Sequence, residues 1–204
     1  MTSRSVGAIV LAAGGSRRMG QPKQLLPFRE RTLLRHAAET VVASVCRPIV
    51  VVIGANSNVV KRELQSLPVL IAHNPEWLSG IGSSLRVAIA TLRAFDDLEG
   101  AVITLADQPL VTSSALNRIV KAHYASGKQI VASEYADTHG VPVFIGEQFF
   151  DEIAALQGDQ GAKCVIARHL EAMTTVPLGE DSLDIDTPMD YERLTGAHLP
   201  ASRR

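Results

Sequence analysis

The chain has 204 residues, of which 46% are hydrophobic, so it is long enough and apolar enough to build a sizeable core. Its 20 basic residues balance 21 acidic ones, and the net charge of -1 excludes the broad basic field that attracts nucleic acid. Two cysteines exclude a disulfide framework, and no apolar run reaches the roughly 18 residues that a transmembrane helix needs. We therefore expect a cytoplasmic protein, a single domain over residues 1–204, with no nucleic-acid or membrane partner.

The first predicted element is a strand that ends in a glycine-rich loop. The apolar run from Val6 to Leu11 is typical of a buried strand, and residues 14–23 then carry three glycines, two arginines and a lysine. Glycine lets the backbone approach an anion, so this loop predicts a phosphate site. The spacing excludes the dinucleotide motif G-x-G-x-x-G, and Gln21 excludes a P-loop because it stands where that motif has lysine.

The first half of the chain alternates strands and helices. Thr32 can cap a helix, and apolar residues recur after it at helical spacing. Such alternation predicts a parallel sheet covered on both faces, with ligands bound outside the carboxyl ends of its strands. The loop at 14–23, the segment at 80–84 and Asp107 should therefore converge on one rim. After the first strand, the predicted elements are a helix from Thr32, strand 47–54, helix 56–66, strand 69–72, a helix opened by 82–84 and strand 101–106.

The second half has a mixed pattern. Thr112 can cap its first helix, and Pro188 suits the first turn of its last helix. We expect the strands of this half to extend the sheet in mixed directions. The elements predicted between these two helices are strands 129–133 and 141–145, helices 147–157 and 160–170, and strands 173–177 and 183–185.

The glycine-rich loop resembles a pattern of the nucleotidyltransferases, enzymes that join a nucleoside monophosphate to a phosphorylated acceptor. The pattern is L-A-A-G-x-S-x-R-M-G-x-x-K, and every fixed position is present between Leu11 and Lys23. Three further segments are D-Q-P at 107–109, G-D-Q-G-A-K at 158–163 and D-I-D-T-P at 184–188. They resemble segments of the molybdenum cofactor cytidylyltransferases and their purine-catabolism relatives. Two positions depart from that family: Met189 replaces a glutamate, and residues 140–142 are G-V-P where the family often has G-H-P.

This resemblance implies a three-layer, Rossmann-like α/β fold with a mostly parallel sheet, helices on both faces and a mixed C-terminal extension. It divides the domain into a nucleotide-binding half, residues 1–111, and an acceptor-binding half, residues 112–196. In the family a G-x-x-x-S-L segment, here residues 80–85, lines the base and ribose. The implied nucleotide-binding residues are Leu11, Ala12, Ala13, Gly14, Gly15, Ser16, Arg17, Arg18, Lys23, Gly82, Ser83 and Ser84.

The resemblance also implies which residues carry the chemistry. Lys23, Arg18 and Asp107 would be catalytic, and Asp107 and Asp186 would hold the cofactor Mg²⁺, which takes one or two carboxylates together with substrate phosphates. Asp186 also fits an ordinary helix-capping sequence, so the residues alone leave its role open. The implied acceptor-binding residues are Gly140, Pro142, Asp159, Gly161 and Lys163.

The implied reaction transfers CMP from CTP to the terminal phosphate of molybdenum-molybdopterin, releases pyrophosphate and gives the cytosine dinucleotide form of the cofactor. Ala13 favours CTP, because the guanylyl branch typically has glycine there and so has room for a larger base. A molybdenum hydroxylase that receives the product is an expected transient partner. The alternatives are a nucleotidyltransferase that uses GTP or a sugar or polyol phosphate acceptor, and a non-catalytic carrier of the molybdenum cofactor.

Overall fold

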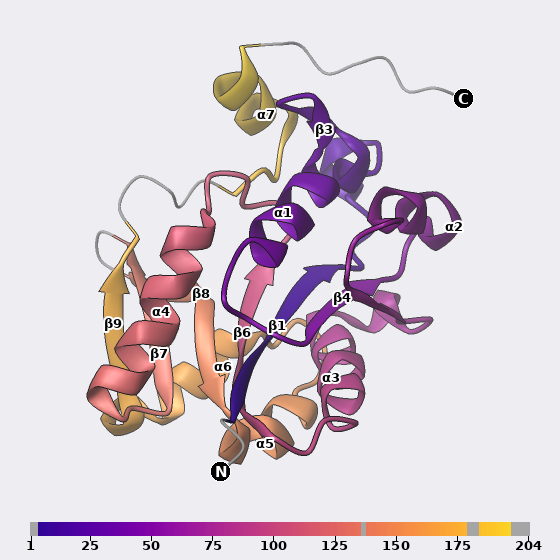
Figure 1. The fold of residues 1–204 in the computed structure, drawn as a ribbon. Helices are drawn as coiled ribbons and strands as arrows, with labels where there is room; N and C mark the ends of the chain where they lie inside the picture. The colour runs from indigo at the N-terminus through magenta and orange to yellow at the C-terminus, as the bar shows by residue number, and fades with distance from the viewer. Residues whose placement is uncertain (1–3, 136–137, 179–183, 197–204) are drawn as a thin grey trace.

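The computed structural model describes residues 4–135, 138–178 and 184–196, and a seven-stranded sheet runs through it (Figure 1). The strand order is β5-β4-β1-β6-β8-β7-β9. A separate hairpin pairs β2 (Pro27–Phe28) with β3 (Arg31–Thr32). The strands of the large sheet are β1 (Ser5–Ala12), β4 (Ile49–Ile53), β5 (Leu70–His73), β6 (Leu98–Leu105), β7 (Ile130–Tyr135), β8 (Thr138–Gly146) and β9 (Met173–Pro177).

The sheet is parallel in its first half and mixed in its second. β1 pairs in parallel with β4 and β6, and β4 pairs in parallel with β5. β8 runs antiparallel to both β6 and β7, and β9 runs parallel to β7. The predicted mostly parallel sheet with a mixed C-terminal extension is therefore confirmed.

Successive residues of β1 point into two different cores. Ala8 and Val10 pack with α1 and α4 on one face, whereas Ile9 and Leu11 pack with α3 on the other. Side chains alternate along a strand, so a strand buried on both faces must be apolar throughout. All five residues of β4 are buried, as its continuous β-branched run predicts.

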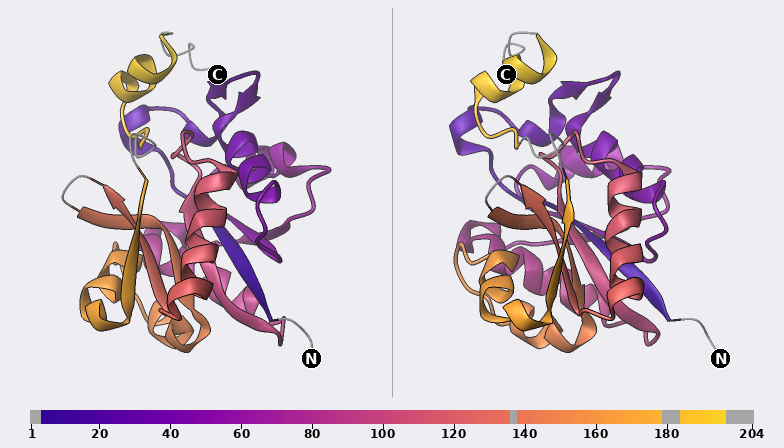
Figure 2. Two further views of the ribbon diagram at one scale, coloured as in Figure 1. Left: turned by 60° about the vertical axis from the view of Figure 1, so that its left-hand side comes forward. Right: turned by 90° about the vertical axis from the view of Figure 1, so that its left-hand side faces the viewer.

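Helices cover both faces of the sheet, which gives three layers (Figures 1 and 2). In the right-hand view of Figure 2, α4 lies on one side of the strands, and α5 and α6 lie on the other. One face carries α1 (Leu33–Val42), α2 (Ser57–Val60) and α4 (Ser113–Ser126), and the other carries α3 (Ile81–Leu92), α5 (Phe150–Ala154) and α6 (Ala162–Arg168).

Three threonines cap helices, as the sequence predicts for Thr32 and Thr112. The side chains of Thr32, Thr112 and Thr187 each accept a hydrogen bond from the backbone N–H three residues on. Thr187 also forms a reciprocal capping box with Asp190 at the start of α7 (Pro188–Thr195). The capping carboxylate is therefore Asp190, and Asp186 is left available for other contacts.

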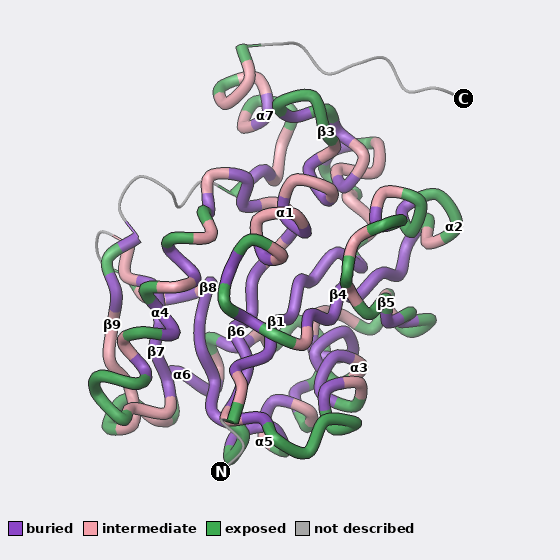
Figure 3. Tube along the Cα trace, viewed as in Figure 1, coloured by how far each residue is buried: buried purple, intermediate pink, exposed green. Residues whose placement is uncertain are grey.

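A third apolar cluster closes one end of the molecule, where α7 lies beside the β2–β3 hairpin in Figure 1. In Figure 3 the buried residues follow the central strands, and the exposed residues lie mainly on outer turns. The cluster joins the glycine-rich loop to the C-terminal helix, and its buried members are Met19, Leu26, Phe28, Leu33, Ile185 and Tyr191.

The helix predicted at 56–66 is wrong in extent. The structure has the short α2 followed by a 3-10 turn over Lys61–Leu64. Asn56 before it has a left-handed backbone and its side chain does not cap the helix. The β-branched residues Val59 and Val60 favour helix only weakly, so little stabilises a longer one.

The helices predicted at 147–157 and 160–170 are also shorter than expected. A 3-10 turn over Glu147–Phe149 precedes α5, and another over Leu170–Ala172 follows α6. The chain turns between α5 and α6 through Gly158, whose φ is 56°, and its carbonyl accepts a hydrogen bond from the Gly82 amide. This packing against α3 ends the helical run.

The strand predicted at 183–185 is not formed by residues 184 and 185, and residue 183 lies outside the described part of the chain. The Ile185 amide donates a hydrogen bond to the Asp107 carbonyl, with N···O 2.9 Å, but no ladder follows. The Ile185 side chain is buried in the third cluster, which explains its apolar character. None of the helices in the described ranges is both long and apolar enough to cross a membrane.

Candidate nucleotide-binding site

A cavity of about 400 Å³ opens where β1 and β6 end. The predicted convergence of the glycine-rich loop, the start of α3 and Asp107 is seen in its lining. Arg18, Ser16, Gly82 and Ser83 are not among the residues that line it. The lining residues are Leu11, Ala12, Ala13, Gly14, Gly15, Arg17, Lys23, Gln24, Trp77, Leu78, Gly80, Ile81, Ser84, Leu105, Ala106, Asp107 and Asp159.

Gln24 holds the glycine-rich loop in shape from inside the protein. It is buried, and its Nε2 donates to the carbonyls of Ala12 and Gly14 at 2.9 and 2.6 Å. Its Oε1 accepts from the Ser16 hydroxyl, which itself accepts from the backbone amide of Lys23. Ser16 therefore shapes the loop from behind, whereas Gln24 braces it at the cavity, which Gly14 and Gly15 also line.

Trp77 forms one wall of the cavity against two glycines. A Cβ on Gly15 would lie 2.7 Å from the Trp77 ring, and one on Gly54 would lie 2.7 Å from Trp77 Cβ. No larger residue fits at either position without moving the tryptophan. Trp77 therefore packs against these glycines at the cavity itself.

Lys23 connects the loop to two carboxylates. Its ammonium group donates to Asp107 Oδ2, to Asp186 Oδ1 at 3.2 Å and to the Ile185 carbonyl at 3.3 Å. Arg18 donates to Asp186 Oδ2 at 2.9 Å. The Lys23 and Asp107 side chains are only 20% and 15% exposed, whereas Arg18 is 69% exposed. The predicted catalytic and metal-binding residues thus form one contiguous cluster.

The charge states of this cluster follow from its surroundings. Burial lowers the pKa of Lys23, but the charges and hydrogen bonds of Asp107 and Asp186 outweigh burial, and the net pKa is raised. Lys23 is therefore a cation at neutral pH. Asp107 Oδ1 is buried and lacks a hydrogen-bond partner among the described residues.

The unpartnered Asp107 Oδ1 bears on whether the cluster fits a divalent cation. A buried carboxylate oxygen without a donor is costly unless a cation or ligand meets it. Two carboxylates that already converge on one ammonium group match the oxygen set that Mg²⁺ prefers. No group of three or more His, Cys, Asp or Glu side chains that could hold a metal gathers anywhere in the described ranges, this cluster included, so a cation here would need further ligands from substrate. Asp107 and Asp186 therefore fit a metal completed by substrate oxygens.

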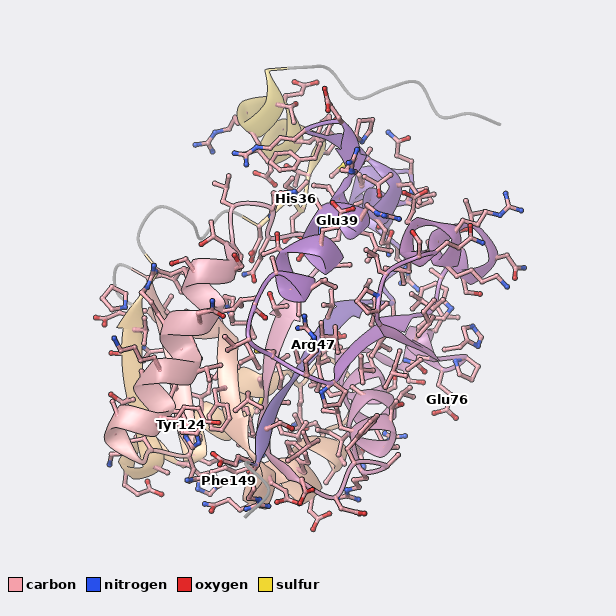
Figure 4. All side chains as sticks on the ribbon, viewed as in Figure 1. His36, Glu39, Arg47, Glu76, Tyr124 and Phe149 are labelled. Atoms are coloured by element: carbon pink, nitrogen blue, oxygen red, sulfur yellow. The ribbon has the colours of Figure 1, made fainter. Side chains whose placement is uncertain are left out.

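The loop after Asp107 is held by α1. His36 on α1, labelled in Figure 4, has its Nε2 3.0 Å from the Pro109 carbonyl. Because a carbonyl only accepts, His36 Nε2 carries the proton and donates. Burial lowers the pKa of His36, and the Arg29 charge adds to this effect, so the neutral ring holds this loop.

The start of α3 contributes to the cavity in two layers. Gly80, Ile81 and Ser84 line it, and Gly80 has a φ of 98°, a conformation that favours glycine. Ser83 is buried behind them; its hydroxyl accepts from Asn74 and donates to the Gly80 carbonyl. The N-terminal cap of α3 is Gly80, so Ser83 does not cap this helix.

A second cavity, of about 510 Å³, adjoins the first. Leu11, Ile81, Leu105 and Asp159 line both, so the two cavities share a wall. The lining of the second cavity is mainly apolar. Its other members are Leu85, Ile103, Gln108, Tyr135, Thr138, Val141, Gly161, Ala162, Lys163, Cys164 and Asp184.

The predicted acceptor residues lie at or next to this second cavity. Asp159, Gly161 and Lys163 line it directly. Gly140 lies beneath the Lys163 side chain, since a Cβ there would be 3.0 Å from Lys163 Cε. Pro142 does not line it; its carbonyl instead accepts a hydrogen bond from Ser133 at 2.6 Å.

Two polar groups of the second cavity have no role predicted from the sequence, although Gln108 belongs to the D-Q-P segment. Gln108 donates to Asp184 at 2.9 Å, but its Oε1 is buried without a partner in the described ranges. The Tyr135 hydroxyl is likewise buried and makes no well-formed hydrogen bond there; burial raises the pKa of Tyr135 to about 12, although the nearby side chains of Gln108 and Ser133 oppose the rise. Removal from water and the charges of Asp107 and Asp186 raise the pKa of Asp184.

Replacing Gln24 with leucine should loosen the glycine-rich loop. The variant leaves the Ala12 and Gly14 carbonyls without their donor, and an unsatisfied buried group costs about 1–3 kcal/mol. We expect a lower free energy of unfolding by about that amount and a weaker nucleotide affinity, measured by urea denaturation and calorimetric titration with CTP. Gln65→Leu, at an exposed position, should change stability by less than about 0.5 kcal/mol. Equal stability of the two variants would contradict the role of Gln24.

The chain has a three-layer α/β fold. A glycine-rich loop that carries cationic side chains follows β1, and a pair of carboxylates faces this loop. Together these features define a nucleotide-binding transferase. Comparison with known families makes this specific. The MobA-like NTP transferase domain matches residues 8–173, and the chain belongs to that family.

Curated relatives of the chain carry different names. Nicotine blue oxidoreductase of Paenarthrobacter nicotinovorans is 30% identical over 93% of this chain and 96% of the relative. The molybdenum cofactor cytidylyltransferase of Escherichia coli K12 is 28% identical over 92% of this chain and 94% of the relative. These similarities span nearly whole proteins, but the two names state different activities.

Among solved structures, Rv0371c from Mycobacterium tuberculosis is similar throughout. It has 32% sequence identity and a TM-score of 0.81, and the match covers 95% of this chain and 99% of that one. A structure of Rv0371c in complex with manganese has 30% identity and a TM-score of 0.79, over 96% and 100% of the two chains. The chain therefore has the α/β nucleotidyltransferase fold.

Proposed function

We propose that the chain transfers CMP from CTP to the terminal phosphate of molybdenum-molybdopterin and releases pyrophosphate. The observation that carries this proposal is the pair of adjoining cavities with the Lys23–Asp107 contact at the first of them. A donor nucleotide in the first cavity and an acceptor in the second would meet at the shared wall. The similarity to the E. coli molybdenum cofactor cytidylyltransferase supports the choice of acceptor.

The reaction needs positioning and charge stabilisation more than proton transfer. A terminal phosphate oxygen of the acceptor attacks the α-phosphorus of CTP, the bond to the bridging oxygen breaks, and pyrophosphate leaves. The attacking oxygen is already an anion, so no general base is required. The barrier lies in bringing anions together and stabilising the added charge.

The residues in and beside the first cavity have distinct roles in this scheme; Ser16 and Arg18 do not line it, but Ser16 belongs to the loop at its edge and Arg18 contacts Asp186. The backbone N–H groups of residues 14–16 and the Arg18 guanidinium hold the β- and γ-phosphates, and Lys23 reaches the α-phosphate. Arg17 lines the cavity and adds positive charge. Ala13 also lines it and limits the space for the base, which favours the smaller ring of cytosine.

Asp107 and Asp186 would hold Mg²⁺, which would supply positive charge to the phosphate oxygens when bound. The manganese complex of Rv0371c supports a divalent cation in this family. The unpartnered Asp107 Oδ1 supports the same assignment in this chain. Without the cation, these carboxylates would repel a nucleotide, so their placement beside the phosphate loop argues for a metal.

The second cavity suits a ring system that carries polar groups and a phosphate. Its apolar lining would cover the faces of the ring, and Gln108 Oε1 and the Tyr135 hydroxyl would meet polar groups at the ring edge. Lys163 lines this cavity and would meet the acceptor phosphate. Transient docking to a molybdenum hydroxylase would then deliver the product.

The test is an assay of pyrophosphate release with purified molybdenum cofactor, Mg²⁺ and each nucleoside triphosphate in turn. We expect release with CTP and the molybdenum cofactor together, and none when either is omitted. Asp107→Asn protein, prepared in parallel, controls for a contaminating activity. The assay also distinguishes this proposal from the redox activity stated in the name of the P. nicotinovorans relative.

Each other outcome points to a different function. Release with GTP in place of CTP would favour a guanylyl donor, and release only with a sugar or polyol phosphate would replace the acceptor. Tight binding of the molybdenum cofactor without release from any triphosphate would favour a carrier. Any of these results would overturn the proposed reaction.

A further inference from the structure

We propose that the Lys23 ammonium group occupies the metal position until a nucleotide draws it away, so that metal and nucleotide bind cooperatively. This inference rests on the proposed function, because it concerns the same nucleotide site. It adds a regulatory role to Lys23, beyond contact with the α-phosphate.

In this arrangement the Lys23 ammonium group has no N–H donor left to bind a phosphate. An ammonium group has three N–H donors. Lys23 directs them to Asp107 Oδ2, Asp186 Oδ1 and the Ile185 carbonyl, so none remains for a ligand. Lys23 must therefore give up at least one of these contacts before it binds an α-phosphate.

In the same arrangement most carboxylate oxygens of Asp107 and Asp186 already accept hydrogen bonds and are not available to a metal. Asp186 uses Oδ1 for Lys23 and Oδ2 for Arg18, and Asp107 uses Oδ2 for Lys23. Asp107 Oδ1 alone of these four oxygens has no partner in the described ranges. A divalent cation that bound both carboxylates would also lie next to the positive charge of Lys23, which repels it at short range in a partly buried site.

A triphosphate relieves both restrictions at once. Its negative charge attracts Lys23 and Arg18 away from the carboxylates, and its oxygens complete the coordination of the metal. Since binding linkage is reciprocal, nucleotide then strengthens metal binding by the same factor as metal strengthens nucleotide binding. Removing the ammonium group should open the metal site even without nucleotide.

The experiment measures Mn²⁺ binding by electron paramagnetic resonance in the absence of any nucleotide, on the full chain. Lys23→Met keeps the apolar stem and removes the charge, and we expect it to bind Mn²⁺ more tightly than the wild type, by roughly 5- to 150-fold. Lys23→Gln, which retains an N–H donor for Asp107 and so protects the fold, should change in the same direction. Lys121→Met, at an exposed position of α4, should bind Mn²⁺ as the wild type does.

A second readout follows the same linkage. Mn²⁺ should raise the melting temperature of Lys23→Met and Lys23→Gln more than that of the wild type, because it neutralises carboxylates that have lost their counter-ion. Equal or weaker Mn²⁺ binding by both variants would overturn the inference and leave the metal assignment intact. Absence of Mn²⁺ binding in the wild type and in both variants, with or without CTP, would overturn the metal assignment and the inference together.

Discussion

Replacing Lys23 with alanine is expected to lower kcat by a factor on the order of 10²–10³, because deletion of a charge that acts in the transition state has that cost. In the proposed function the Lys23 ammonium group contacts the α-phosphate, where negative charge accumulates in the transition state. In the structure Lys23 contacts Asp107 and Asp186, and it gives up at least one of these contacts to reach the α-phosphate. Steady-state pyrophosphate release at saturating CTP measures the effect.

Two controls separate chemistry from folding in this variant. Lys121→Ala removes a lysine from an exposed part of α4 and should leave kcat within about twofold, in line with the small effects of surface substitutions. Circular dichroism and thermal melting show whether Lys23→Ala still folds with Asp107 unpaired. An unchanged kcat in a folded Lys23→Ala protein would remove Lys23 from the mechanism.

Replacing Asp107 with asparagine is expected to reduce kcat by a comparable or larger factor, at least on the order of 10². Asparagine preserves the size of the side chain but lacks the charge that holds Lys23 in this structure and would hold a metal once Lys23 moves away. The variant should also need a higher Mg²⁺ concentration to reach half of its maximal rate. Assays of pyrophosphate release across a Mg²⁺ series measure both quantities.

The matched control for this variant is Asp96→Asn. Asp96 is exposed in the turn between α3 and β6, at the opposite end of β6 from Asp107. We expect its kcat and Mg²⁺ dependence to match those of the wild type. A folded Asp107→Asn protein with wild-type kcat and Mg²⁺ dependence would show that Asp107 neither binds metal nor contributes charge.

Much of the fold could be predicted because the signals are local. Continuous β-branched runs predict strands buried on both faces, and threonines before apolar periodic segments predict helix starts. Helix lengths were predicted less well, because packing decides them. Gly158, which turns the chain against Gly82 after α5, illustrates a tertiary contact that no local pattern contains.

The candidate site, like the fold, could be predicted only where its residues belong to one local motif. The glycine-rich loop is contiguous in sequence, so its contribution to the rim follows from one motif. Asp186 lies 163 residues from Lys23, and only the fold shows that the two side chains meet. Gln24 directly follows the last position of the motif, and its role depends on two carbonyls that point inward. Its burial could not be inferred from a polar residue in a loop.

The third apolar cluster bears on how the protein is made. It joins residues near position 20 to Ile185 and Tyr191, and the Tyr191 hydroxyl donates to the Pro27 carbonyl at 2.8 Å. During synthesis the central strands leave the ribosome well before these late residues, and contacts so distant in sequence form slowly. The phosphate loop should therefore remain mobile in the nascent chain and become competent for ligand only when the final helix docks.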